Sequence, residues 1–132
     1  MPEVASAIEP LIGEHGTKLW CVGGQLHRVG GPAVEYANGG EQWFLNGQLH
    51  REDGPAKTFA SGRKEWWVGG KLHREDGPAI EYANGDSVWY FNGLVHRSNG
   101  PAVCRSMTGN EFWMDGQKLT RNKNTGIGDI SG

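Results

Sequence analysis

The stretch Leu72-His73-Arg74-Glu75-Asp76-Gly77-Pro78-Ala79 has close copies at intervals of 23 residues along the chain. Self-similarity with a period of about 20–50 residues is the signature of a repeat architecture, in which each unit stacks on its neighbours. Four residues of the repeat occur in four copies each: Trp20, Trp43, Trp66 and Trp89; His27, His50, His73 and His96; Arg28, Arg51, Arg74 and Arg97; and Pro32, Pro55, Pro78 and Pro101.

Each repeat has the pattern of two β-strands. In Glu65–Val68 successive side chains point to opposite faces, and Pro78–Tyr82 provides the return strand. Asn46-Gly47 and Asn92-Gly93 are typical of type I′ hairpin turns, which need a positive φ at both central residues. The sequence predicts an all-β fold, a single-layer, open antiparallel meander of β-hairpin repeats with about nine or ten strands. For Val4–Ile12 a helix and a strand both stay open.

The repeat also divides the chain into segments. We expect a degenerate capping half-repeat over residues 1–19, four repeats over 20–111, a second capping half-repeat over 112–121 and a flexible tail over 122–132. In the second cap Lys118 reads as an insertion and Thr120 as the replacement for the histidine. Atypical end repeats prevent further stacking in a solenoid.

Composition removes several classes of partner. The 132 residues carry 13 Lys and Arg against 15 Asp and Glu, which gives no electrostatic footprint for duplex DNA or an anionic membrane. No apolar run approaches the roughly 20 residues of a transmembrane helix, and no secretory signal is visible, so we expect a cytoplasmic protein. Cys21 and Cys104 are separated by more than three repeats, and we expect both thiols to be free.

The histidine–arginine row is the most conspicuous polar feature. Equivalent positions of successive repeats should lie about 9–10 Å apart, which is too far for two of them to share a metal ion. We expect each imidazole to bond the backbone of the Gly-Pro loop, and each guanidinium to stack on an aromatic ring or to pair with an acid such as Asp53 or Asp76. The alternative is an anion-binding row formed by Arg28, Arg51, Arg74 and Arg97.

Two aromatic rows run along the repeats. One contains the constant tryptophans, and the other lies one residue further on, at Phe44, Trp67, Tyr90 and Trp113. The second row varies between repeats, which pure architecture would not require, and exposed aromatic side chains mark interfaces. We therefore predict it as the partner-binding surface, with partial burial in a folded-over sheet as the alternative.

No set of unlike groups suggests catalysis, because a ladder of near-identical residues is the opposite of one positioned constellation. The chain is therefore predicted not to be an enzyme, and no cofactor or metal is expected. A stacking platform for single-stranded nucleic acid would also need a basic groove, which the charge balance does not provide.

The phrase Tyr82-Ala83-Asn84-Gly85-Asp86, followed by Trp89, Asn92-Gly93 and His96, resembles a MORN repeat. The Arg-x-x-Gly-Pro-Ala segment makes it a variant, similar to the Leu-His-Arg-x-x-Gly-Pro-Ala proteins of phages, bacteria and large DNA viruses. The resemblance covers about residues 17–121. It implies an open hairpin array that binds lipid head groups or proteins.

These features together predict a non-catalytic binding module. From the resemblance we expect a phage or bacterial accessory protein that inhibits or sequesters a host protein, acting in the host cytoplasm if phage-encoded. One alternative is a sponge for an anionic nucleotide, held by Arg and Trp of adjacent repeats or at a dimer interface. A second is a self-associating scaffold. The sequence leaves both a monomer and a homodimer open.

Overall fold

The computed structural model describes residues 9–121 and 130–131. All regular structure in these residues is β, and it includes one nine-stranded antiparallel sheet whose strands follow one another without returning to the first. This confirms the all-β, open antiparallel hairpin fold that the repeat predicts. The chain forms two compact units, Met1–Lys71 and Leu72–Gly132, which are described separately.

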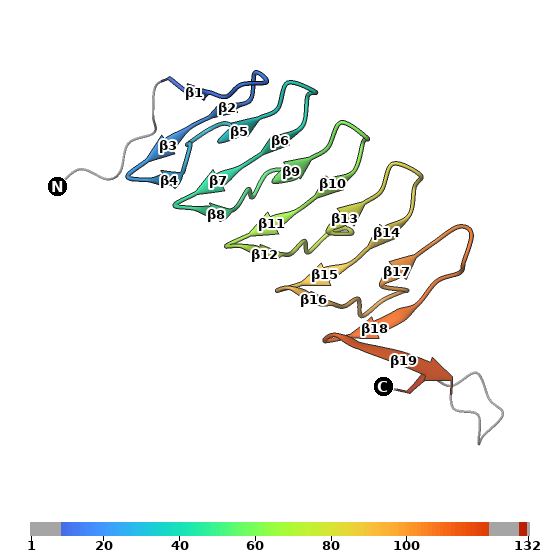
Figure 1. The fold of residues 1–132 in the computed structure, drawn as a ribbon. Helices are drawn as coiled ribbons and strands as arrows, with labels where there is room; N and C mark the ends of the chain where they lie inside the picture. The colour runs from blue at the N-terminus through green and yellow to red at the C-terminus, as the bar shows by residue number, and fades with distance from the viewer. Residues whose placement is uncertain (1–8, 122–129, 132) are drawn as a thin grey trace. The chain divides into compact units, whose positions relative to one another are not determined.

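The first unit is a succession of hairpins (Figure 1). Its sheet strands, in order, are β1 (Leu11–Ile12), β2 (Lys18–Leu19), β5 (Val34–Glu35), β6 (Glu41–Gln42), β9 (Lys57–Thr58) and β10 (Lys64–Glu65). Small separate hairpins project from this sheet: β3–β4 (Cys21–Val22 and Gln25–Leu26), β7–β8 (Phe44–Leu45 and Gln48–Leu49) and β11–β12 (Trp67–Val68 and Lys71–Leu72).

The second unit repeats the same plan. Its sheet strands are β13 (Ile80–Glu81), β14 (Ser87–Val88) and β17 (Val103–Cys104), and its small hairpin is β15–β16 (Tyr90–Phe91 and Leu94–Val95). The last repeat forms a three-stranded sheet of β18 (Phe112–Met114), β19 (Gln117–Arg121) and β20 (Ile130–Ser131).

Each repeat therefore has four short strands, not the two long ones that the alternation suggested. The predicted strand Glu65–Val68 is divided at Trp66, with β10 ending before it and β11 beginning after it. The equivalent Trp43 shows the reason, because its N–H donates to Ala56 O while its carbonyl accepts from His50 N. The tryptophan backbone thus joins two hairpins with different partners. The predicted return strand Pro78–Tyr82 is likewise limited to β13.

The tight turns of the small hairpins are as predicted. Asn46 and Gly47 have φ angles of 49° and 79°, and Asn92 and Gly93 have 50° and 83°. A positive φ at both central residues is the requirement of a type I′ turn, whose twist matches that of the flanking strands. Gly69-Gly70 and Asp115-Gly116 adopt the same conformation.

Each chain end contains one short described strand. Leu11–Ile12 is a strand, paired with β2, while residues 1–8 lie outside the described part of the chain. Within the predicted tail, Ile130–Ser131 pairs with β19, and residues 122–129 and 132 lie outside the described part.

The register of the last repeat corrects the predicted insertion. Lys118 pairs with Trp113 as Val95 pairs with Tyr90, so Lys118 takes the place of Val95 and nothing is inserted. Leu119 then stands in the histidine position and Thr120 in the arginine position. The last repeat therefore lacks both side chains that characterise the others.

The core is thin and made of small side chains. Ala33, Ala56, Ala79 and Ala102, the last residues of the Gly-Pro-Ala triplets, have no exposed surface. In the second unit Ile80, Val88 and Val103 form a buried cluster. A single layer offers no second sheet to pack against, so contacts between neighbouring hairpins must provide much of the stability.

We predict that Gly69→Ala lowers the free energy of unfolding by about 1–2 kcal/mol, the cost of a left-handed conformation for an ordinary L-residue. Gly69 has φ 57°, and no atom lies within 4 Å of the place that an added Cβ would take, so the effect is one of backbone conformation alone. The matched control is Gly69→Asn, because asparagine holds the same position in two other repeats. Urea unfolding followed by tryptophan fluorescence measures both, and equal losses would contradict the explanation.

Candidate functional site

The repeat arginines lie flat on the tryptophans of their own repeats. The guanidinium carbon is 3.8 Å from the ring centroid in Arg28–Trp20 and in Arg51–Trp43, and 3.9 Å in Arg97–Trp89. Cation–π stacking at a partly desolvated site contributes up to about 2 kcal/mol. The arginine stems and heads thus cover one face of the constant tryptophan row.

The Gly-Pro-Ala loop closes over the other side of the guanidinium. Nη1 of Arg51 donates to Pro55 O at 3.2 Å, and the other three repeat arginines make the same bond at 3.0–3.1 Å. A Cβ added to Gly54 would lie 2.9 Å from Arg51 Cζ, so a side chain there would force the guanidinium to shift. The guanidinium is therefore held between an indole ring and a glycine.

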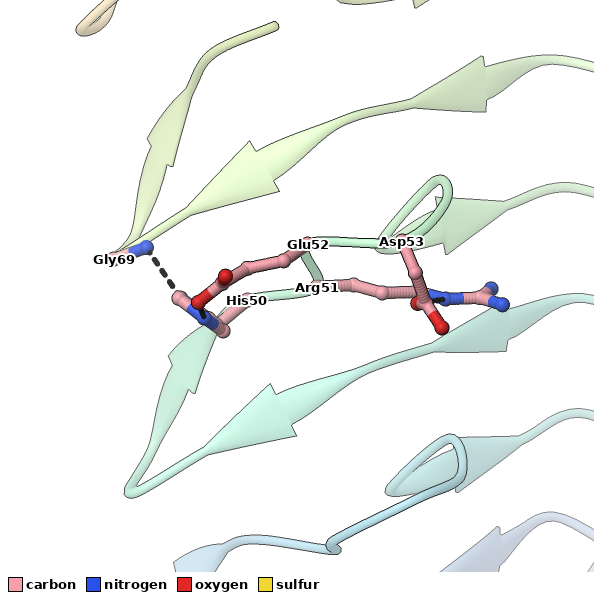
Figure 2. A network of polar contacts seen from close by, with 5 residues as sticks. All are labelled: His50, Arg51, Glu52, Asp53 and Gly69. Carbon is pink, nitrogen blue, oxygen red and sulfur yellow. Dashed lines mark hydrogen bonds and ion pairs between the residues drawn. The ribbon is translucent and has the colours of Figure 1, made fainter.

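Acidic residues complete the environment of three of these arginines. Arg51 Nε is 2.9 Å from Asp53 Oδ1, as Figure 2 shows, and Arg74 lies 3.1 Å from Glu81 and 3.4 Å from Asp76. Arg28 pairs with Glu35 at 3.4 Å. The hydrogen bond and the charge of Arg51 hold the pKa of Asp53 below its ordinary value of 3.8. These contacts favour a structural role for Arg28, Arg51 and Arg74 over the anion-binding row.

The histidines join successive repeats. His50 Nδ1 accepts from the backbone N–H of Gly69, nineteen residues further on, at 2.9 Å (Figure 2). His27, His73 and His96 accept in the same way from the following hairpin turns, at Asn46, Asn92 and Asp115.

The prediction that these imidazoles bond the Gly-Pro loop is therefore wrong. Each Nδ1 bonds the next small hairpin instead. The second ring nitrogen meets an acid of its own loop, His50 Nε2 with Glu52 at 3.1 Å and His73 Nε2 with Glu75 at 3.6 Å. In the first repeat Val29 replaces that glutamate, and Nε2 of the buried His27 has no partner in the described part of the chain.

The predicted partner-binding residues lie in the small hairpins and are half-buried. The first unit places Phe44 in β7 and Trp67 in β11, and the second places Tyr90 in β15 and Trp113 in β18. Tyr90 and Trp113 also pack against the Ile80, Val88 and Val103 cluster. Each ring therefore has both a packed and a solvent-facing part.

Two of these rings are fixed by carboxylates. The indole N–H of Trp67 donates to Glu65 at 2.8 Å, and that of Trp113 donates to Glu111 at 2.9 Å. Both acids stand two residues before the tryptophan, and the chain has no acid at that place before Phe44 or Tyr90. The hydrogen bond from Trp113, with Lys118 and Arg105 nearby, holds the pKa of Glu111 below its ordinary value of 4.5.

Several large apolar side chains outside the predicted aromatic row are exposed. In the second unit they include Phe91, Leu94, Phe112 and Met114, and in the turn loops they include Tyr36, Phe59, Tyr82 and Met107. The sequence does indicate that Phe112 is uncovered, because Thr120 takes the place of the arginine that covers the equivalent tryptophans.

The remaining chemistry-bearing residues form no further cluster. Cys21 and Cys104 are both free thiols, as the repeat spacing predicted. Across residues 9–121 and 130–131, no three His, Cys, Asp or Glu side chains gather in a way that could hold a metal ion. No helix in that part of the chain is long and apolar enough to span a membrane.

We predict that Arg51 and Gly54 are energetically coupled. Gly54→Ala should cost about 1–3 kcal/mol because the added methyl group overpacks the loop against the guanidinium. In an Arg51→Ala background the same change should cost much less, since the crowding atoms are gone. A double-mutant cycle by urea unfolding measures the coupling, and strictly additive losses would contradict the close-packed loop.

We also predict that Glu111 contributes to stability near neutral pH and that this contribution disappears in acid. A carboxyl whose pKa is lower in the folded chain takes up a proton on unfolding, so the free energy of unfolding falls as the pH falls from about 5 to 3. Glu111→Gln should make this fall shallower, and Trp113→Phe, which removes the N–H donor, should do the same. Urea unfolding at a series of pH values measures the slope, and an unchanged slope in both variants would refute the assignment.

Comparison with known proteins adds no assignment to this geometry. No protein-family model matches the sequence, and no curated protein or solved structure shows significant similarity to it. The candidate site rests on the half-buried aromatic side chains and the arginine loops themselves.

Proposed function

We propose that the chain is a non-catalytic, MORN-like repeat module that binds a protein partner through the aromatic row, defined as Phe44 and Trp67 in the first unit and Tyr90 and Trp113 in the second. The observation that carries the proposal is that these rings are partly exposed, and that two of them are held in place by carboxylates. Partly exposed Trp and Tyr side chains are the residues that most often dominate binding energy at interfaces.

Ring fixation lowers the cost of binding. A side chain that becomes immobilised at an interface loses about 0.5–1.5 kcal/mol of conformational entropy. Trp67 has already lost part of this freedom, because Glu65, which is 4% exposed, holds its indole N–H. A rigid, amphipathic ring of this kind is suited to recognition of a protein surface.

Variation between repeats supports the same surface. Trp20, Trp43, Trp66 and Trp89 are identical, and at Trp20, Trp43 and Trp89 the repeat arginine stacks on the indole. The aromatic row instead changes from phenylalanine to tryptophan to tyrosine and back to tryptophan. The equivalent position of the first repeat is Cys21, so the repeat does not require a ring there and the differences are available for specificity.

The source and setting follow from the resemblance stated above. We propose a phage or bacterial accessory protein that sequesters a host component in the cytoplasm. The predominance of acidic over basic residues is compatible with a protein partner and unfavourable for duplex DNA.

We predict that Trp67→Ala abolishes capture of the partner from an extract of the natural host, while Trp67→Phe retains most of it because an earlier repeat carries Phe44 at that place. Phe59→Ala, at an exposed ring of a turn loop outside the row, is the matched control and should leave capture unchanged. Quantitative pull-down with thermal melting of each variant measures both properties.

The melting temperatures separate the two explanations of a loss. A change of 1 kcal/mol shifts the melting temperature of a domain this size by roughly 2–8 °C. Loss of capture with a shift within that range supports an interface. A much larger shift for Trp67→Ala would show that the row is part of the core. Loss of capture in Phe59→Ala as well would show that capture does not depend on the row specifically. Either result would contradict the proposed surface.

A further inference from the structure

The loop that follows His96 differs electrostatically from its three equivalents. Arg28, Arg51 and Arg74 each pair with a carboxylate, whereas no carboxylate in the described part of the chain lies within 4.0 Å of Arg97. Asn99 stands where two of the other loops have Asp53 and Asp76, and Cys104 stands where the preceding repeat has Glu81. Both acids that pair with Arg74 are therefore replaced beside Arg97.

The replacement leaves hydrogen-bond donors unused. Arg97 Nε donates to Asn99 Oδ1 at 3.2 Å and Nη1 donates to Pro101 O at 3.1 Å, so Nη2 has no acceptor among the described residues. Asn99 accepts through Oδ1, and its Nδ2 group has two further hydrogens that can donate. Ser98, in the place of Glu75, adds a hydroxyl. The two acids Glu75 and Asp76 are thus replaced in this loop by residues that can donate hydrogen bonds.

These donors line a groove with an apolar wall. A groove of about 350 Å³ is bounded by Arg97, Ser98 and Asn99 on one side and by Trp89 and Phe91 on another. Phe91 is 43% exposed, although its equivalents in the first three repeats are half-buried. The guanidinium remains stacked on Trp89, which holds its free edge in a fixed direction.

We propose that this groove binds a carboxylate group carried next to an apolar group, with Arg97 as the charged partner. Glu75 and Asp76 line the same groove, and their charges oppose a dianionic phosphate more strongly than a monoanionic carboxylate. An acidic side chain of a peptide and a small free acid share this chemistry. The groove is separate from the aromatic row, so its test is independent of the proposed function.

The first unit contains a built-in negative control. An equivalent groove of about 290 Å³ lies beside Arg51, but its own loop carries Glu52 and Asp53, and Asp53 occupies the Nε group. Two carboxylates line each groove, but Asp53 pairs with Arg51 itself, whereas no acid in the described part of the chain pairs with Arg97. Arg51 should therefore bind no carboxylate, although its stack on tryptophan is the same.

The test follows the Nε–Hε signals of Arg97 and Arg51 by two-dimensional NMR during titration with the peptide acetyl-Leu-Glu-Leu-amide. Acetate, inorganic phosphate and acetyl-Leu-Gln-Leu-amide are titrated in parallel. We expect a saturable shift of Arg97 with the glutamate peptide and none of Arg51. A peptide that binds more tightly than acetate identifies a peptide side chain as the ligand, and equal affinities identify a small acid.

Exchanging the residues that differ between the two loops tests whether the loop acids prevent carboxylate binding. Ser98→Glu with Asn99→Asp should weaken peptide binding at Arg97 by at least about tenfold, since two charges are placed beside the ligand. Glu52→Ser with Asp53→Asn should create binding at Arg51. Both variants use residues that the same loop already carries elsewhere, and the remaining spectrum reports whether the fold is kept.

Four results would overturn the proposal. They are the absence of a saturable shift at Arg97, tighter binding of phosphate than of the carboxylate peptide, equal binding of the glutamine peptide, and unchanged affinity in the Ser98→Glu, Asn99→Asp variant. The pull-down experiment on the aromatic row can fail without affecting any of these results, and the reverse also holds.

Discussion

The guanidinium of the repeat arginine, held between an indole ring and a glycine at Arg28, Arg51 and Arg97, organises the loop of its repeat. Arg51 lies over Trp43, donates to Pro55 O and would have to shift if residue 54 carried a side chain. The motif Trp…His-Arg-x-x-Gly-Pro-Ala thus has a reason for several of the residues around the arginine. Tryptophan supplies the ring, glycine the space and alanine a side chain small enough for a site with no exposed surface, while the arginine also bonds the backbone carbonyl at the proline position.

A single-layer sheet has little core, so neighbouring repeats must be joined in other ways. The histidine accepts a bond from the next hairpin turn, and the tryptophan backbone connects a hairpin of the main sheet with a small hairpin. Both are short-range contacts between consecutive units, as expected for a solenoid in which stability is a sum of neighbour terms. The last repeat lacks the histidine and the arginine, and its strand β19 (Gln117–Arg121) continues instead of turning into a loop.

Because the repeated side chains are occupied by one another, function is to be sought where the repeats differ. Most of the repeated tryptophan, histidine and arginine side chains bond within or between repeats, and Arg97 is an exception because its loop has no acid. The aromatic row changes its ring from repeat to repeat, and the loop of Arg97 has lost its acids. Both departures leave the fold intact while altering what the surface presents to solvent, which is the physical basis for placing binding at these positions.

Local spacing and φ preferences along the chain were enough to predict the all-β class, the 23-residue unit, the type I′ turns at Asn46-Gly47 and Asn92-Gly93, and the two free cysteines. They also identified Asp53 as an acid within reach of Arg51, because the two residues share one tight loop. The division of the strand at each tryptophan, the bond from the next turn to the histidine and the register of Lys118 became evident only in three dimensions. Those features depend on which backbone groups of neighbouring hairpins come within hydrogen-bond distance. The pattern of residues along the chain does not specify these pairs.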